Sequence, residues 1–145
     1  MTILAVALIA VSAAQTTLPS LPGKACTPAA LVGTWSVVEA KQGDETIPTG
    51  PTDPIEYKYV TPTHFLVFQV AGGGANTITW AHGGTYTLAG GTYTENIQYG
   101  FGPPFSVVNG KSFSFQCTME GNDTWHNAGD VNGLAIVETW KRVSK

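Results

Sequence analysis

Residues Gly83–Tyr99, GGTYTLAGGTYTENIQY, carry the strongest structural signal in this chain. Threonines alternate with larger side chains on both sides of Gly90-Gly91, and Thr, Tyr and Ile suit the pleated surface of a β-sheet. A glycine pair between two alternating segments is typical of a tight hairpin turn. This region therefore predicts two neighbouring strands, Thr85–Leu88 and Thr92–Tyr99.

The same two-residue period continues through most of the chain from Gly33 onward. Gly, Asn and Pro pairs separate short segments rich in Val, Ile, Thr and aromatic residues. Such close turns favour an antiparallel up-and-down meander, in a sandwich or a barrel, because parallel strands need longer crossovers. The predicted strands are Thr34–Ala40, Ile55–Val60, Thr63–Val70, Thr77–Ala81, Thr85–Leu88, Thr92–Tyr99, Ser112–Glu120, Thr124–Asn127 and Ala135–Val143.

Length and composition indicate one all-β domain with a core of its own. The chain has 145 residues, of which 43% are hydrophobic and only 12% charged. A formal net charge of −3 argues against a nucleic-acid partner, which selects for clustered Lys and Arg. No run of like charge indicates a membrane-surface patch.

The N-terminal part predicts export. Residues 1–14 are apolar and end in small residues, as a secretory signal peptide does, and the apolar stretch is too short to span a bilayer. We therefore expect a secreted or periplasmic protein, with residues 15–30 as an N-terminal arm. Within the arm, Thr27 and Pro28 suit the start of a short helical turn that leads into the first strand.

Two cysteines remain after the predicted cleavage, Cys26 and Cys117. In an oxidising compartment an even pair is most simply a disulfide, which would tie the arm to the sheet. The alternative is two unrelated buried thiols. Neither cysteine has the spacing of a metal ligand, and the three histidines are scattered, so we predict no metal site and no cofactor.

Two longer connections have no strand pattern. Residues 41–54 are polar and rich in Pro and Gly, and residues 100–105 are stiff and carry two phenylalanines. Each is either a cover over one end of the fold or an ordinary surface loop.

Alternation assigns side chains to faces. In Thr92–Tyr99 the face with the large apolar side chains also carries Glu95, which predicts an enclosed carboxylate. Because a carboxylate among aromatic rings is costly unless it is paired or protonated, Glu95 either serves a ligand or a reaction or is held by a structural partner such as a Tyr hydroxyl or His64. Alternation also turns His64 inward, so that His64 and Glu95 would form an acid–base pair. The predicted ligand-binding residues are Phe68, Tyr93, Glu95, Ile97, Tyr99, Phe113 and Phe115.

The two ends of the domain resemble a known family. LVGTW at Leu31–Trp35 resembles the G-x-W that opens the first strand of lipocalins and their calycin relatives. ETWKR at Glu138–Arg142 resembles their closing strand, and GGTYTLAGGTYTENIQY looks like bacterial lipocalin-like domains of unassigned function. The resemblance implies an eight-to-nine-stranded barrel over residues 31–145, with Arg142 packed on Trp35. It also implies an internal cavity, although the middle lipocalin motif has no match here.

Three functions follow as alternatives. The first is a binding protein for a small hydrophobic or aromatic molecule. The second is a cofactor-free barrel enzyme, an isomerase, cyclase or hydrolase in which Glu95 and His64 exchange protons. The third is an interaction protein of the cell envelope. Glu138, with Arg142 on its predicted face, is interpreted as one half of a structural ion pair. The oligomeric state is left open.

Overall fold

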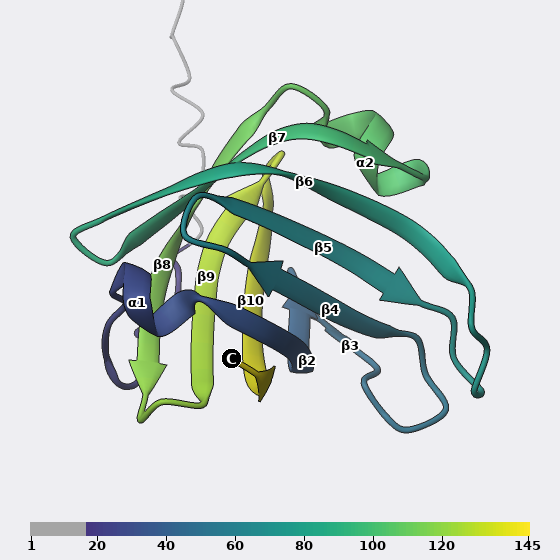
Figure 1. The fold of residues 1–145 in the computed structure, drawn as a ribbon, viewed down its shortest axis with the longest axis horizontal. Helices are drawn as coiled ribbons and strands as arrows, with labels where there is room; N and C mark the ends of the chain where they lie inside the picture. The colour runs from purple at the N-terminus through teal and green to yellow at the C-terminus, as the bar shows by residue number, and fades with distance from the viewer. Residues whose placement is uncertain (1–16) are drawn as a thin grey trace, which may run out of the picture.

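A closed antiparallel β-barrel is the body of the molecule (Figure 1). The computed structural model describes residues 17–145, so the predicted signal peptide lies outside the described residues. Within them, eight strands form the wall: β2 (Gly33–Gln42), β4 (Ile55–Val60), β5 (His64–Val70), β6 (Ile78–Ala89), β7 (Thr92–Phe101), β8 (Ser112–Glu120), β9 (Thr124–Val131) and β10 (Leu134–Ser144). The predicted all-β, up-and-down barrel of eight to nine strands is confirmed.

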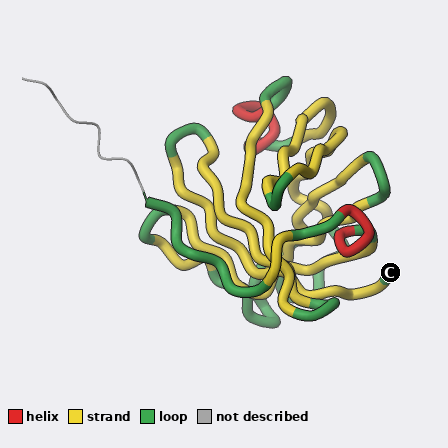
Figure 2. Tube along the Cα trace, turned by 90° about the vertical axis from the view of Figure 1, so that its left-hand side faces the viewer, coloured by secondary structure: helices red, strands yellow, loops and turns green. Residues whose placement is uncertain are grey.

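The wall strands pair in chain order. From β4 to β10, each strand pairs antiparallel with the wall strand that precedes it, and β10 pairs with both β9 and β2, which closes the barrel. Two short strands, β1 (Lys24–Ala25) and β3 (Glu45–Ile47), extend the sheet beside β8 and β2. Two short helices, α1 (Pro28–Leu31) and α2 (Pro103–Val108), lie outside the wall (Figure 2). Neither helix is long and apolar enough to cross a membrane.

Strand β6 corrects the sequence prediction of two strands, Thr77–Ala81 and Thr85–Leu88. The chain runs straight through Gly83-Gly84 instead of turning there. A Cβ on Gly84 would lie 1.9 Å from the carbonyl oxygen of Asn96, and one on Gly83 would meet the ring of Tyr99. These glycines therefore allow close approach of the neighbouring strand, which is the other common role of glycine within a sheet.

One end of the barrel is filled by aromatic side chains. Trp35, Trp125 and Trp140 are fully buried, and the rings of Trp35 and Trp125 meet edge to face with centroids 5.5 Å apart. The guanidinium of Arg142 lies 4.0 Å from the ring centroid of Trp35, a cation–π contact. It also donates hydrogen bonds to the carbonyls of Ala30 and Val32, at 2.6 and 2.9 Å. Arg142 thus fastens the α1 segment to this end, which we call the closed end.

The N-terminal arm is attached at the same end. The indole N–H of Trp35 donates to the carbonyl of Leu31 at 2.8 Å, which fixes α1 against the start of β2. Cys26 and Cys117 form a disulfide, as the sequence predicted. The bond joins the arm to β8, next to the short pairing of β1 with that strand.

Candidate functional site

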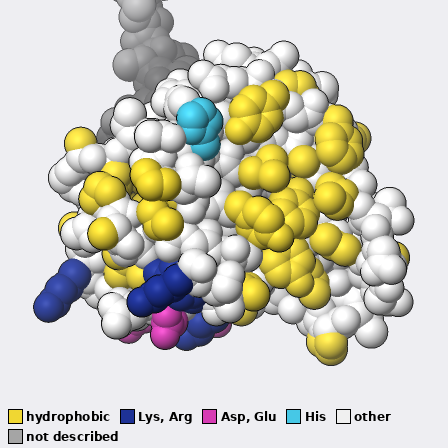
Figure 3. Space-filling model, viewed as in Figure 1, with side chains coloured by type: hydrophobic (Ala, Val, Ile, Leu, Met, Phe, Trp, Pro, Cys, Tyr) yellow, Lys and Arg dark blue, Asp and Glu magenta, His cyan; other side chains and the backbone are white. Residues whose placement is uncertain are grey.

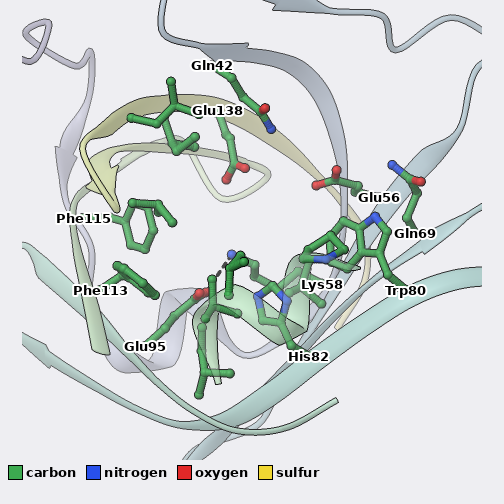
Figure 4. Close-up of a pocket in the computed structure, with 18 of the residues that line it drawn as sticks. Gln42, Glu56, Lys58, Gln69, Trp80, His82, Glu95, Phe113, Phe115 and Glu138 are labelled. Atoms are coloured by element: carbon green, nitrogen blue, oxygen red, sulfur yellow. Dashed lines mark hydrogen bonds and ion pairs between the residues drawn. The ribbon is translucent and has the colours of Figure 1, made fainter. Parts of the chain in front are cut away.

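The rings of Trp35, Trp125 and Trp140 at the closed end form an aromatic plug. A cavity of about 330 Å³ occupies the part of the barrel that this plug does not fill. Its apolar lining comes mainly from Trp80, Ile97, Val108, Phe113, Phe115 and Trp140. Its polar lining comes from Glu56, Lys58, His82, Glu95 and Glu138, with the amides of Gln42 and Gln69 (Figure 4). An apolar cavity with a few polar groups is the usual form of a small-molecule site, and this volume is near the lower end of the range of roughly 300–1,000 Å³.

The cavity reaches the surface near α2 and the β9–β10 turn. Val107 on α2 and Leu134 at the start of β10 both line the cavity, although they are 56% and 43% exposed. Ile47 of β3 and Pro104 of α2 also line it. The two connections at residues 41–54 and 100–105 therefore both border the cavity. This agrees with their interpretation as covers over one end of the fold.

Glu95 is enclosed in the barrel, and its partner is Lys58. The Nζ of Lys58 lies 2.8 Å from a carboxylate oxygen of Glu95, and the two side chains are 4% and 6% exposed. The same Nζ lies 4.8 to 5.7 Å from the ring centroids of Tyr93, Trp125 and Trp140. Burial alone lowers the pKa of Lys58, but the carboxylates of Glu95 and Glu138 outweigh it and the pKa is raised. The ammonium therefore stays charged at neutral pH.

Two further carboxylates face the cavity. Glu138 accepts a hydrogen bond from the indole N–H of Trp140 at 2.9 Å, and burial raises its pKa. Burial, and next the charge of Glu138, raise the pKa of Glu56 to about 7, against the opposing effects of Lys58 and Gln69. The cavity wall thus contains one carboxyl group, that of Glu56, whose charge changes near neutral pH.

His82 is the histidine of the interior. Its ring stacks on Trp80 with centroids 5.4 Å apart and an interplanar angle of 13°, and its Nδ1 is buried with no hydrogen-bond partner among residues 17–145. Burial lowers the pKa of His82, so the ring is neutral at pH 7. The sequence prediction missed His82 because it ended a strand at Ala81. Alternation along a continuous β6 would have put His82 on one face with Trp80 and Tyr86.

The predicted inward orientation of His64 is wrong. His64 is exposed at the start of β5, and its Nδ1 hydrogen-bonds the hydroxyl of Thr63 at 2.7 Å. Phe65 and Val67 are the buried residues of that strand that point inward. The strand reads HFLVFQV, with large apolar side chains on both faces, so its alternation did not determine which face is inside. The acid–base pair of His64 with Glu95 does not form.

Phe68 and Tyr99 are also on the outer face, which corrects their prediction as cavity residues. Phe68 packs between Tyr57 and Tyr59, with ring centroids 5.6 and 5.2 Å away. Tyr99 is turned outward by a β-bulge, because Gly84 pairs with Ile97 and Gly83 with Tyr99, which leaves Gln98 unpaired. Figure 3 shows an apolar surface on the side of the barrel formed by β4, β5 and β6.

Of the other predicted ligand-binding residues, Glu95, Ile97, Phe113 and Phe115 line the cavity. Tyr93 is wholly buried beneath the cavity, where its ring packs on Tyr86 and Trp125. The interpretation of Glu138 and Arg142 as an ion pair is wrong. Glu138 faces the cavity, whereas Arg142 lies at the closed end, where its charged partner is Asp123 at 3.2 Å.

Comparison with known proteins shows the fold and no family. No family model matches this sequence, and no curated protein sequence matches it. Among solved structures, a redesigned β-barrel aligns at a TM-score of 0.51 and 18% identity, over 85% of this chain and 98% of that one. A mutant of the fluorescent protein UnaG aligns at a TM-score of 0.44 and 11% identity, over 82% of this chain and all of that one. The first likeness shows the β-barrel fold.

The raised pKa of Glu56 predicts a pH-dependent stability difference. An unfolded glutamate ionises near its ordinary value of 4.5, but folded Glu56 ionises only near pH 7. Between these values the folded state binds more protons, so rising pH destabilises it. We expect Glu56→Gln to be more stable than wild type by about 3 kcal/mol near pH 8, and nearly equal to it near pH 4.5. Urea unfolding of both proteins at several pH values measures the difference, and a difference that does not change with pH would contradict it.

Proposed function

We propose that this chain is an exported, lipocalin-like binding protein that holds a small apolar or aromatic molecule in its internal cavity. The observation that carries the proposal is the cavity of about 330 Å³, walled by aromatic rings and a few polar groups. Burial of an apolar ligand there would contribute roughly 25 cal/mol per Å². The G-x-W segment with Arg142 over Trp35 supports the lipocalin-like assignment. The disulfide supports an oxidising compartment.

The enzyme alternative has less support. Its proposed acid, His64, lies on the outer surface, and its proposed base, Glu95, is bound to Lys58. The carboxylate of Glu95 is already occupied by the Nζ of Lys58 at 2.8 Å, and no acid stands opposite it in the predicted place. The observed features of the cavity therefore support ligand binding better than they support proton transfer.

Native mass spectrometry of the protein recovered from its own host tests the proposal in one experiment. The mass of the chain reports whether the predicted signal peptide, residues 1–14, was removed and whether the disulfide formed. The non-covalent adduct reports what the cavity retained. An uncleaved chain from the cytosol would contradict export.

A cavity-filling variant tests where the ligand sits. Ile136 lines the cavity on β10, whereas Val137, the next residue, faces the outer surface. We expect the neutral fluorescent probe N-phenyl-1-naphthylamine to bind the wild type, and Ile136→Phe to weaken binding about tenfold, or about 1.4 kcal/mol. The matched control Val137→Phe should bind like the wild type. If the wild type bound no probe and retained no ligand, or if Ile136→Phe bound it unchanged, the cavity would not be a ligand site.

A further inference from the structure

The charges around the cavity do not balance within the protein. Three carboxylates line it, Glu56 from β4, Glu95 from β7 and Glu138 from β10. Among the lining residues of the described chain, Lys58 supplies the one permanent cation, since His82 is neutral at pH 7. The lining therefore contains two more acidic groups than basic ones.

Lys58 is already engaged by Glu95. Its Nζ lies 2.8 Å from that carboxylate and is held against the rings of Trp125 and Trp140. An ammonium in this position cannot also form a direct ion pair with both Glu56 and Glu138. A buried carboxylate without a cation is costly, and it is relieved by protonation or by a cation from outside.

Glu56 and Glu138 face the same cavity from opposite sides of β2. That strand pairs with β4 on one edge and with β10 on the other. Figure 4 shows both carboxylates pointing into the open space, with that of Glu138 on the side facing the pair of Lys58 and Glu95. The rings of Phe113 and Phe115 line the other side of that space. The buried Nδ1 of His82, also on the wall, has no hydrogen-bond partner within residues 17–145.

We propose that the cavity selects an organic cation, a small aromatic or apolar body with an amine whose ammonium group faces Glu56 and Glu138. The inference rests on the proposed binding function and names the ligand class for it. An ammonium supplies the charge that the cavity lacks and several hydrogen-bond donors. Aromatic walls favour both its apolar body and its charge. A carboxylate ligand would add a further negative charge beside Glu56 and Glu138, and a neutral ligand would leave these acids to be relieved by protonation alone.

Binding of such a cation is coupled to proton release. Glu56 is partly protonated near neutral pH, with Glu138 on β10, Lys58 on its own strand and Gln69 on β5 as the groups that act on it. An ammonium beside Glu56 favours the charged form and displaces the proton. The affinity for an amine therefore falls as the pH is lowered from about 8 to about 5.

Three probes with the same phenyl group and similar size test the ligand class by isothermal titration calorimetry. They are 2-phenylethylamine, 2-phenylethanol and 3-phenylpropionate, which end in a cation, a neutral group and an anion. We expect the amine to bind about tenfold more tightly than the alcohol, and the alcohol more tightly than the acid. The enthalpy of amine binding should depend on the ionisation enthalpy of the buffer, which reports the released proton.

Isosteric variants assign the selectivity to the two acids. Glu56→Gln and Glu138→Gln should each reduce the ratio of amine to alcohol affinity about tenfold, because each removes one charge and keeps the shape. Glu45→Gln, on the exposed strand β3, is the matched control and should leave the ratio unchanged. Circular dichroism checks the fold of each variant, and the wild-type probe series and proton release test the inference without any substitution.

The outcomes separate the two proposals. If N-phenyl-1-naphthylamine binds but the amine binds no more tightly than the alcohol, the cavity is a ligand site and the inference of a cationic ligand is overturned. The same holds if the acid binds best, or if the glutamine variants keep the wild-type ratio. If neither N-phenyl-1-naphthylamine nor any of the three probes binds, the proposed function itself fails.

Discussion

Replacing Lys58 by methionine is expected to lower the free energy of unfolding by about 3–5 kcal/mol. The substitution keeps most of the apolar side chain but removes the ammonium that lies 2.8 Å from Glu95. The side chain of Glu95 is only 6% exposed, so its carboxylate would remain buried without a cation. The contacts of the ammonium with the faces of Tyr93, Trp125 and Trp140 would be lost as well. Urea unfolding followed by tryptophan fluorescence measures the loss.

A second substitution distinguishes the unpaired charge from lost packing. In Lys58→Met/Glu95→Leu both charges are gone, and we expect the double variant to regain most of the lost stability, because an apolar pair is often as stable as a buried ion pair. Lys41→Met, at an exposed position of β2, is the control and should change stability by less than about 0.5 kcal/mol. If Lys58→Met cost no more than this control, the ion pair would not be a stabilising element of the interior.

The strands were predictable where their two faces differ strongly. In Thr92–Tyr99 the large apolar side chains are on one face and threonine, asparagine and glutamine on the other, so the interior position of Glu95 followed from alternation. The bulge at Gln98 was not visible in the pattern, and it turned Tyr99 outward. Strand β5 has apolar side chains on both faces, and there alternation predicted the wrong one.

The inward orientation of Glu56 and Lys58 could not be predicted from the sequence, for a different reason. Strand β4 reads IEYKYV, and the usual rule puts its tyrosines inside and Glu56 and Lys58 in water. The structure has the reverse orientation, which is possible because Lys58 meets Glu95 from β7 inside the barrel. A pairing between residues 37 positions apart is a property of the closed sheet and not of local sequence. An enclosed Glu95 did indicate that a partner must exist, without identifying Lys58.

Loss of the disulfide is the second large effect that we expect. Cys26 and Cys117 are 91 positions apart, and cross-linking a loop of this length stabilises a fold by roughly 4 kcal/mol in the chain-entropy model. The double variant Cys26→Ser/Cys117→Ser should therefore lose roughly that much free energy of unfolding. Guanidinium unfolding of the variant and of the wild type, with and without dithiothreitol, measures it. Reductant should destabilise the wild type alone.

The same variant separates the stability of the closed end from the function of the cavity. The disulfide joins the arm to β8 beside the aromatic plug. Phe113 and Phe115, nearer the start of the same strand, line the cavity. Because eight paired strands close the wall of the described chain without the arm, the folded variant should keep its cavity. We expect it to bind N-phenyl-1-naphthylamine with wild-type affinity under conditions where it is folded. Weaker binding by the folded variant would mean that the arm holds the whole barrel in shape and not only its closed end.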